Sequence, residues 1–203
     1  MSSKIRELTV AITGASGSAY GLRLIQKLFH RGVQQHILIS QAGRIVIKHE
    51  TGLDLPDDPE SARNILAHHL EISSTHLSCY GINDWFSPAA SGSSRIHRMV
   101  IVPCSMGCLA RIAAGTSDHL IERAADVVLK ESGKLIVVPR ETPLSSIHLE
   151  NMLALTRQAV TVMPAMPAFY QKPENIGDLV EFMVDRVLSH LDLSDQSHFQ
   201  WGR

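Results

Sequence analysis

The sequence predicts a doubly wound α/β fold, with one mostly parallel sheet and helices on both of its faces. Five short apolar runs are rich in Val and Ile and do not alternate with polar residues, which is typical of strands buried on both faces. Segments with apolar residues at helical spacing separate these runs. Ligands of such folds bind beyond the carboxyl ends of the strands, so we expect a site in the segments that follow them.

The five predicted strands are, in order, Leu8–Ile12, His36–Ile39, Met99–Val102, Leu135–Val138 and Val160–Met163. Helical spacing predicts helices over 20–29, over 117–131 ("SDHLIERAADVVLKE") and over 175–191 ("NIGDLVEFMVDRVLSHL"). The stretch from Thr75 to His97 shows neither pattern, which predicts a long irregular loop that is either functional or a mobile lid.

Composition narrows the class of protein. A chain of 203 residues with 44% apolar and 19% charged residues fits one domain with a substantial core, spanning 1–203. Its formal charge of −1 gives no reason to expect a nucleic acid or an anionic membrane as partner. No apolar stretch approaches a membrane span and the N-terminus has no secretory signal, so we expect a cytoplasmic protein.

The stretch "GASGS" follows the first predicted strand and opens a helix. Backbone N–H groups at a helix N-terminus attract anions, so a phosphate is the natural ligand of this corner. The spacing matches neither G-x-G-x-x-G nor a P-loop, and therefore indicates neither NAD nor a nucleoside triphosphate. The alternative is structural, with Ser16 as the N-cap of the helix.

Polar groups follow the other predicted strands at the same sheet edge. Ser40 ends the second strand, and "PCSMGCLARIAAG" after the third is a second small-residue corner that opens a helix. Arg140 and Glu141 follow the fourth strand, where they offer a phosphate clamp and a carboxylate, and Tyr170 lies beyond the fifth.

The motifs "TGASGSAYGLRL", "PAASGSS", "LIERAADVVLKE", "VPRETPLSSIHLENM" and "PAFYQKP" resemble those of the UbiX flavin prenyltransferase family. The resemblance implies a flavodoxin-like architecture and an enzyme that joins the dimethylallyl group of dimethylallyl monophosphate to reduced FMN at N5 and C6. The product would be prenylated FMN, the cofactor of a UbiD-type decarboxylase. Members of the family form homo-oligomers, usually dodecamers, with active sites at subunit interfaces.

The resemblance also implies roles for single residues. It assigns FMN binding to Gly14, Ala15, Ser16, Ser40, Ser105, Met106, Gly107, Cys108 and Arg140. It assigns the substrate phosphate to Lys130, Arg140, Tyr170 and Arg186, with Arg123 near the site. Glu141 becomes the base for the C6 proton and Ser16 a proton relay at N5. Glu50 and Trp85 match functional positions, and Trp201, in a tail over about 192–203, is placed at a neighbouring subunit's site.

No metal is expected. The acidic stretch "DLPDDPE" is rich in proline and is typical of a surface loop, not of clustered aspartates that hold magnesium. Cys104 and Cys108 have poor spacing for zinc, and an odd total of three cysteines favours reduced thiols over a disulfide framework.

Two other functions stay open at the level of sequence. A flavin-dependent decarboxylase of cysteine-type thiols would carry PASANT and PxMNxxM where this chain has "PAASGSS" and "PCSMGCL". A non-catalytic FMN carrier would need the corners but not Lys130, Glu141, Tyr170 or Arg186. Each of these four side chains also has a structural reading, as a solvated charge, an ion pair or a core aromatic.

Overall fold

The computed structural model describes residues 7–94 and 96–193. The chain divides into two compact units, Met1–Ala165 and Met166–Arg203. The predicted role of the tail and of Trp201 at a neighbouring subunit lies outside the described residues and stays a prediction.

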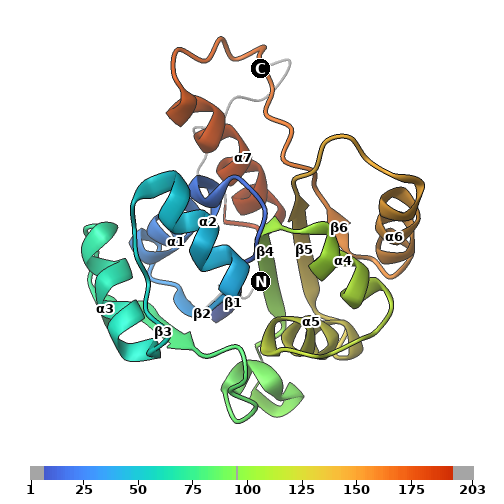
Figure 1. Cartoon of the computed structure of the whole chain (residues 1–203), viewed down its shortest axis with the longest axis horizontal. Coiled ribbons are helices and arrows are strands. Elements are labelled where there is room, and N and C mark those ends of the chain that lie inside the picture. Colours follow the sequence, from blue (N-terminus) through green and yellow to red (C-terminus); the bar gives the residue numbers. More distant parts are fainter. Residues whose placement is uncertain (1–6, 95, 194–203) are drawn as a thin grey trace. The chain divides into compact units, whose positions relative to one another are not determined.

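The first unit is built on a six-stranded, wholly parallel sheet with the order β3-β2-β1-β4-β5-β6 (Figure 1). Its strands are β1 (Glu7–Ile12), β2 (Gln34–Ile39), β3 (Leu77–Tyr80), β4 (Arg98–Cys104), β5 (Lys134–Pro139) and β6 (Thr161–Val162). The strand order reverses between β1 and β4, which is the point at which doubly wound sheets open a crevice for a ligand. The predicted fold class is confirmed.

Six helices and three 3₁₀ turns connect these strands. They are α1 (Ser18–His30), α2 (Gln41–Thr51), α3 (Pro59–His69), η1 (Ser74–His76), η2 (Pro88–Ala90), η3 (Gly92–Ser94), α4 (Met106–Ala113), α5 (Leu120–Lys130) and α6 (Ser146–Arg157). The crossovers through α1 and α5 run in opposite directions along the sheet. Because such crossovers are right-handed, these two helices cover opposite faces.

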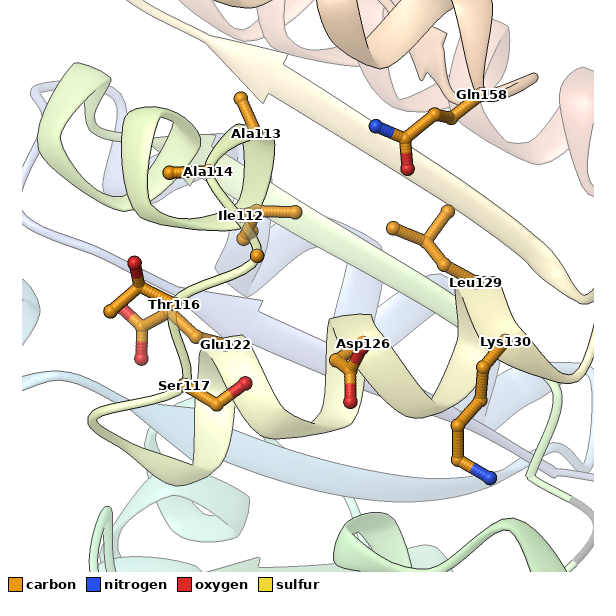
Figure 2. Close-up of a pocket in the computed structure, with 11 residues that line it drawn as sticks. Ile112, Ala113, Ala114, Thr116, Ser117, Glu122, Asp126, Leu129, Lys130 and Gln158 are labelled. Atoms are coloured by element: carbon orange, nitrogen blue, oxygen red, sulfur yellow. The ribbon is translucent and has the colours of Figure 1, made fainter.

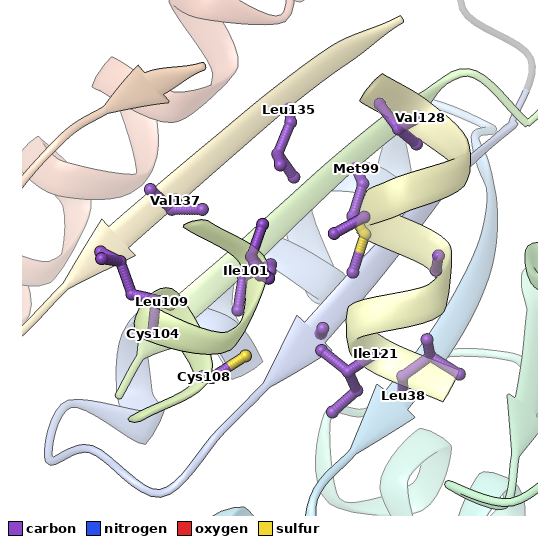
Figure 3. Close-up of a cluster of buried hydrophobic side chains, with 14 of the residues drawn as sticks. Leu38, Met99, Ile101, Cys104, Cys108, Leu109, Ile121, Val128, Leu135 and Val137 are labelled. Atoms are coloured by element: carbon purple, nitrogen blue, oxygen red, sulfur yellow. The ribbon is translucent and has the colours of Figure 1, made fainter. Parts of the chain in front are cut away.

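Beside the β1/β4 switch point, a hydrophobic core packs α4 and α5 onto β4 and β5 (Figure 3). Met99, Ile101, Leu109, Leu135 and Val137 are all fully or almost fully buried there. Burying one such side chain contributes about 2 kcal/mol to stability, so this cluster holds α4 and α5 firmly against the sheet. Cys104 and Cys108 belong to the same cluster and are free cysteines, which agrees with the reduced thiols expected from the sequence.

The described residues of the predicted loop, 75–94 and 96–97, contain more secondary structure than the sequence predicts. They contain η1, β3, η2 and η3, although only Leu77 of β3 is buried. A four-residue strand at the edge of the sheet, with the sequence "LSCY", carries too short an apolar run to be told from a loop.

The second unit contains α7 (Ile176–His190), as its helical spacing predicts. Asn175 caps the helix by accepting from the backbone N–H of Asp178, whose side chain in turn accepts from the N–H of Asn175. This reciprocal capping fixes the first turn of α7.

Thr13 ties β1 to β4 at the switch point. Its hydroxyl donates to the carbonyl of Pro103 over 3.0 Å and accepts from the N–H of Ser105 over 2.7 Å, and the residue is only 2% exposed. Gly21 of α1 lies close to the same strand, since a Cβ there would be 2.5 Å from the carbonyl oxygen of Val102. The corners after β1 and β4 are therefore held side by side.

Thr13→Val should lower the free energy of unfolding by about 1–3 kcal/mol, because a side chain of the same shape leaves the N–H of Ser105 without its acceptor. Thr13→Ser keeps the hydroxyl and serves as the matched control, with a smaller loss. Urea unfolding of the three proteins measures the difference; a valine variant as stable as the serine variant would contradict this role.

Candidate functional site

The corner after β1 already holds an anion, supplied by the chain itself. The carboxylate of Glu50, at the end of α2, accepts from the N–H of Gly17 over 3.0 Å and from the N–H of Ser18 over 2.8 Å. The hydroxyl of Ser18 donates to it over 2.5 Å, and the side chain of Ser16 also hydrogen-bonds to it. Glu50 thus occupies the place at the N-terminus of α1 that the sequence assigned to a phosphate.

This arrangement decides between the two readings of Ser16. Gly17, with φ of 108°, is the N-cap of α1, so Ser16 is not. Burial alone would raise the pKa of Glu50. The hydrogen bonds from Ser16, Ser18 and Gly17 together outweigh this effect, so the pKa lies below its ordinary value. Glu50 is therefore ionised at neutral pH and orients the hydroxyl of Ser16.

A cavity of about 250 Å³ lies where the corners after β1, β2 and β4 meet. Its lining includes Gly14, Ser40, Ser105 and Cys108, which the family resemblance assigns to FMN. Gly14 is needed there, because a Cβ on it would lie 2.5 Å from the Cβ of Ala42. The structure thus brings together most of the predicted cofactor-binding corners within one unit.

The two serines of this cavity are helix N-caps. Ser40 accepts from the N–H of Gly43 over 3.0 Å at the start of α2, and Ser105 accepts from the N–H of Cys108 over 3.4 Å at the start of α4. Contact with Cys104, together with burial, raises the pKa of Cys108 well above its ordinary value. The Cys108 thiol is therefore protonated at neutral pH and is no nucleophile.

Arg140 and Glu141 follow β5 at the same edge. The Nε of Arg140 donates to the carbonyl oxygen of Ser16 over 3.3 Å, which places its guanidinium beside the first corner. Glu141 is exposed, and its carboxylate accepts from the N–H of Thr142 over 3.1 Å. Both residues therefore lie where the sequence expects them.

Lys130 lies at the opposite edge of the sheet from the corners that line the cavity. α5 begins at the carboxyl edge of the sheet and ends at the amino edge, where β5 starts, and its 11 residues span about 16 Å. Lys130 is the last of them and pairs with Glu131 over 2.6 Å. Figure 2 shows it at one end of α5, with Glu122 at the other end. One chain therefore does not bring Lys130 to the corner of Ser16.

Arg123 and the loop before β4 belong with α5. The Nε of Arg123 donates to the carbonyl of Ala90 over 3.1 Å, and its Nη1 pairs with Asp126 over 2.8 Å. Ala90 is part of "PAASGSS", so this arginine holds that motif against the helix. Trp85, in the preceding turn, is 45% exposed.

The second unit carries Tyr170 and Arg186. The ring of Tyr170 meets that of Phe182 edge to face, with the centroids 6.0 Å apart. Arg186 follows Phe182 by one helical turn, so the two side chains lie on the same side of α7. This unit alone therefore brings the predicted phosphate-binding tyrosine near the predicted arginine.

Sequence reasoning missed Arg111, His119 and Glu122, all of which line the cavity beside Ser105. Glu122 is 2% exposed and pairs with the Nε of Arg111 over 2.8 Å. Arg111 and Glu122 are 11 residues apart on separate helices, so no local spacing links them; only the packing of α4 on α5 does.

Flavin mononucleotide suits this lining. The cavity combines small residues, the N-termini of three helices and a buried carboxylate oxygen, Oε2 of Glu122, that has no hydrogen-bond partner among the described residues. A phosphorylated polyol satisfies both kinds of group. Across 7–94 and 96–193 no cluster of three or more metal-ligating side chains is found, and no helix there is long and apolar enough to cross a membrane.

Comparisons with known proteins agree with this class of site. A model of the Flavoprotein family matches residues 1–188. The flavin prenyltransferase UbiX of Pseudomonas aeruginosa is 45% identical over 195 residues, which cover 96% of this chain and 93% of that protein. The fold and the cavity define a flavoprotein of the doubly wound α/β class.

Two solved structures narrow the class further. AnUbiX in complex with FMN and dimethylallyl pyrophosphate has a TM-score of 0.86 at 38% identity, covering 98% of this chain and 99% of that one. A dodecameric FMN-dependent UbiX-like decarboxylase from Escherichia coli O157:H7 has a TM-score of 0.84 at 40% identity, covering 97% and 100%. The chain belongs to the UbiX family of flavin prenyltransferases, which confirms the resemblance seen in its motifs.

Glu50→Gln should destabilise the protein at pH 7 by about 1 kcal/mol or less, because a partly exposed amide replaces the anion at the N-terminus of α1. The stabilisation by ionised Glu50 is complete above its ordinary pKa and disappears as the pH falls through the lowered one. The difference between wild type and variant should therefore shrink below pH 4.5. Urea unfolding from pH 7 to pH 3 measures it, with exposed Glu150→Gln as control; a difference independent of pH would contradict this role for Glu50.

Proposed function

We propose that this protein is a flavin prenyltransferase that joins the dimethylallyl group of dimethylallyl monophosphate to reduced FMN at N5 and C6. The observation that carries the proposal is the cavity at the β1/β4 switch point, where Gly14, Ser40 and Ser105 meet beside Arg140 in a chain of the UbiX family. AnUbiX has been solved with FMN and dimethylallyl pyrophosphate. The preference for the monophosphate is part of the proposal.

Each residue at this edge has a chemical task. Reduced FMN supplies electron density at N5 and C6 for the allylic carbon. Arg140 stabilises the phosphate as its C–O bond breaks. Ser16, held by ionised Glu50, accepts the proton that leaves N5 and passes its own to Glu50. When the second bond closes the new ring, the proton taken from N5 would be returned to the double bond of the dimethylallyl group, whose other carbon bonds to C6, and Glu141 would take the proton that C6 releases.

A second copy of the chain completes this site. Lys130, at the far end of α5, reaches a donor phosphate only from another subunit, and Arg123 lies on the same face of that helix; we place Trp85 at this composite site as well. The UbiX-like relative from Escherichia coli is dodecameric, and we propose the same assembly here. Tyr170 and Arg186, which share one side of the second unit, supply further phosphate contacts.

The product would serve a UbiD-type decarboxylase, and the protein would act in the cytoplasm as one domain over 1–203. The level of identity to a prenyltransferase favours transfer over a thiol decarboxylase. It equally disfavours a passive FMN carrier, since Arg140 and Glu141 stand at the site in addition to the binding corners.

Anaerobic incubation with reduced FMN and dimethylallyl monophosphate, followed by denaturation and mass spectrometry, tests the proposal. We expect a flavin heavier by one five-carbon unit. Glu141→Gln should reduce its formation about 100-fold or more, because the C6 proton loses its base, while FMN affinity stays within about twofold. Glu150→Gln is the matched control. Unchanged FMN released from wild-type protein that demonstrably bound it would refute prenyl transfer.

A further inference from the structure

Three helix N-termini meet at the cavity, and only one of them has a carboxylate of its own. The N-caps Ser40, Ser105 and His119 of α2, α4 and α5 all line it. Glu122 stands in the first turn of α5, whereas the first turns of α2 and α4 contain no acidic residue. The positive ends of α2 and α4 therefore face the cavity without a carboxylate from their own first turns.

Arg111 adds a further positive charge to the cavity, beside the N-terminus of α4. Its Nη1 lies 3.7 Å from the place a Cβ on Gly107 would take, so the guanidinium folds back over the first turn of α4. Arg111 belongs to the last turn of this eight-residue helix, but its guanidinium stands beside the first turn, where a cation costs free energy that the ion pair with Glu122 offsets only in part. Bound anion at the cavity would offset that cost.

Glu122 holds Arg111 in this position with only one of its two carboxylate oxygens. Oε1 of Glu122 accepts from the Nε of Arg111, which leaves the two Nη groups of the guanidinium to point elsewhere. Oε2 is buried and has no hydrogen-bond partner among the described residues, although a buried carboxylate oxygen without a donor is costly. The pair therefore offers cationic donors and one free acceptor to the same cavity.

We propose that Arg111 binds the 5′-phosphate of FMN in this cavity, and that Glu122 positions Arg111 and accepts a hydrogen bond from a ribityl hydroxyl. A sugar-alcohol phosphate is the part of FMN that carries an anion and hydroxyl donors together. The cavity, at about 250 Å³, is below the size of ordinary whole-ligand pockets, which suits one end of the flavin. This inference rests on the proposed function only for the choice of FMN as ligand.

Comparison of FMN with riboflavin, which lacks the phosphate, tests the inference without turnover. Both dissociation constants are measured by flavin fluorescence for wild type, Arg111→Gln and Arg157→Gln, the last being an exposed arginine of α6. Arg111→Gln should reduce the preference for FMN over riboflavin about tenfold or more, since a charge-assisted contact is lost. Arg157→Gln should leave the preference unchanged.

Arg111→Gln leaves Glu122 as a buried charge without its partner and can fail to fold. The double variant Arg111→Gln/Glu122→Gln replaces the ion pair by two neutral amides, and it should lose the preference for FMN to the same extent. A preference within about twofold of wild type in either folded variant would overturn the inference. Failure of prenyl transfer would be seen separately, because it leaves this ratio of dissociation constants measurable.

Discussion

The structure depends on one electrostatic constraint, the positive potential at the carboxyl edge of a parallel sheet. Because all six strands are parallel, the helices that follow β1, β2 and β4 begin at this one edge, where their first N–H groups have no partner within the helix. The N-terminus of α1 is neutralised from within by Glu50, and α5, which also begins at this edge, has Glu122 in its first turn. The N-termini of α2 and α4 stay open to a ligand, and this division decides where an anionic cofactor is held.

The same division places the proposed reacting groups and the proposed phosphate site at different helix N-termini. Because Glu50 occupies the corner after β1, that corner contributes the oriented hydroxyl of Ser16 instead of a phosphate site. Arg140 contacts the carbonyl of Ser16 and brings the segment after β5 into the same place. The reacting end of a flavin would thus lie at β1 and β5, and its phosphate end at α2 and α4.

Much of this arrangement could be predicted from the sequence. Uninterrupted Val and Ile runs gave the central strands, and the small-residue corners marked the cavity, because both signals are local. The partner of the "GASGS" corner could not be predicted, since Glu50 arrives there from the end of another helix, 33 positions away from Gly17. Arg111 was missed for the same reason, since its partner Glu122 belongs to another helix. Strand β3 was missed because a short edge strand has too few apolar residues to be recognised. The resemblance groups Lys130 with Arg140 at the substrate phosphate, but it does not show that the length of α5 separates Lys130 from Ser16 within one chain.

The central claim is that the edge built by one chain is completed by Lys130 of another copy. Oligomers assembled from equal amounts of Ser16→Ala and Lys130→Ala chains test it most directly, with prenylated FMN as the readout. Each variant alone should be inactive, whereas random mixing restores both native residues at about one site in four and should recover about a quarter of wild-type activity. Mixed oligomers no more active than the separate variants would contradict the account.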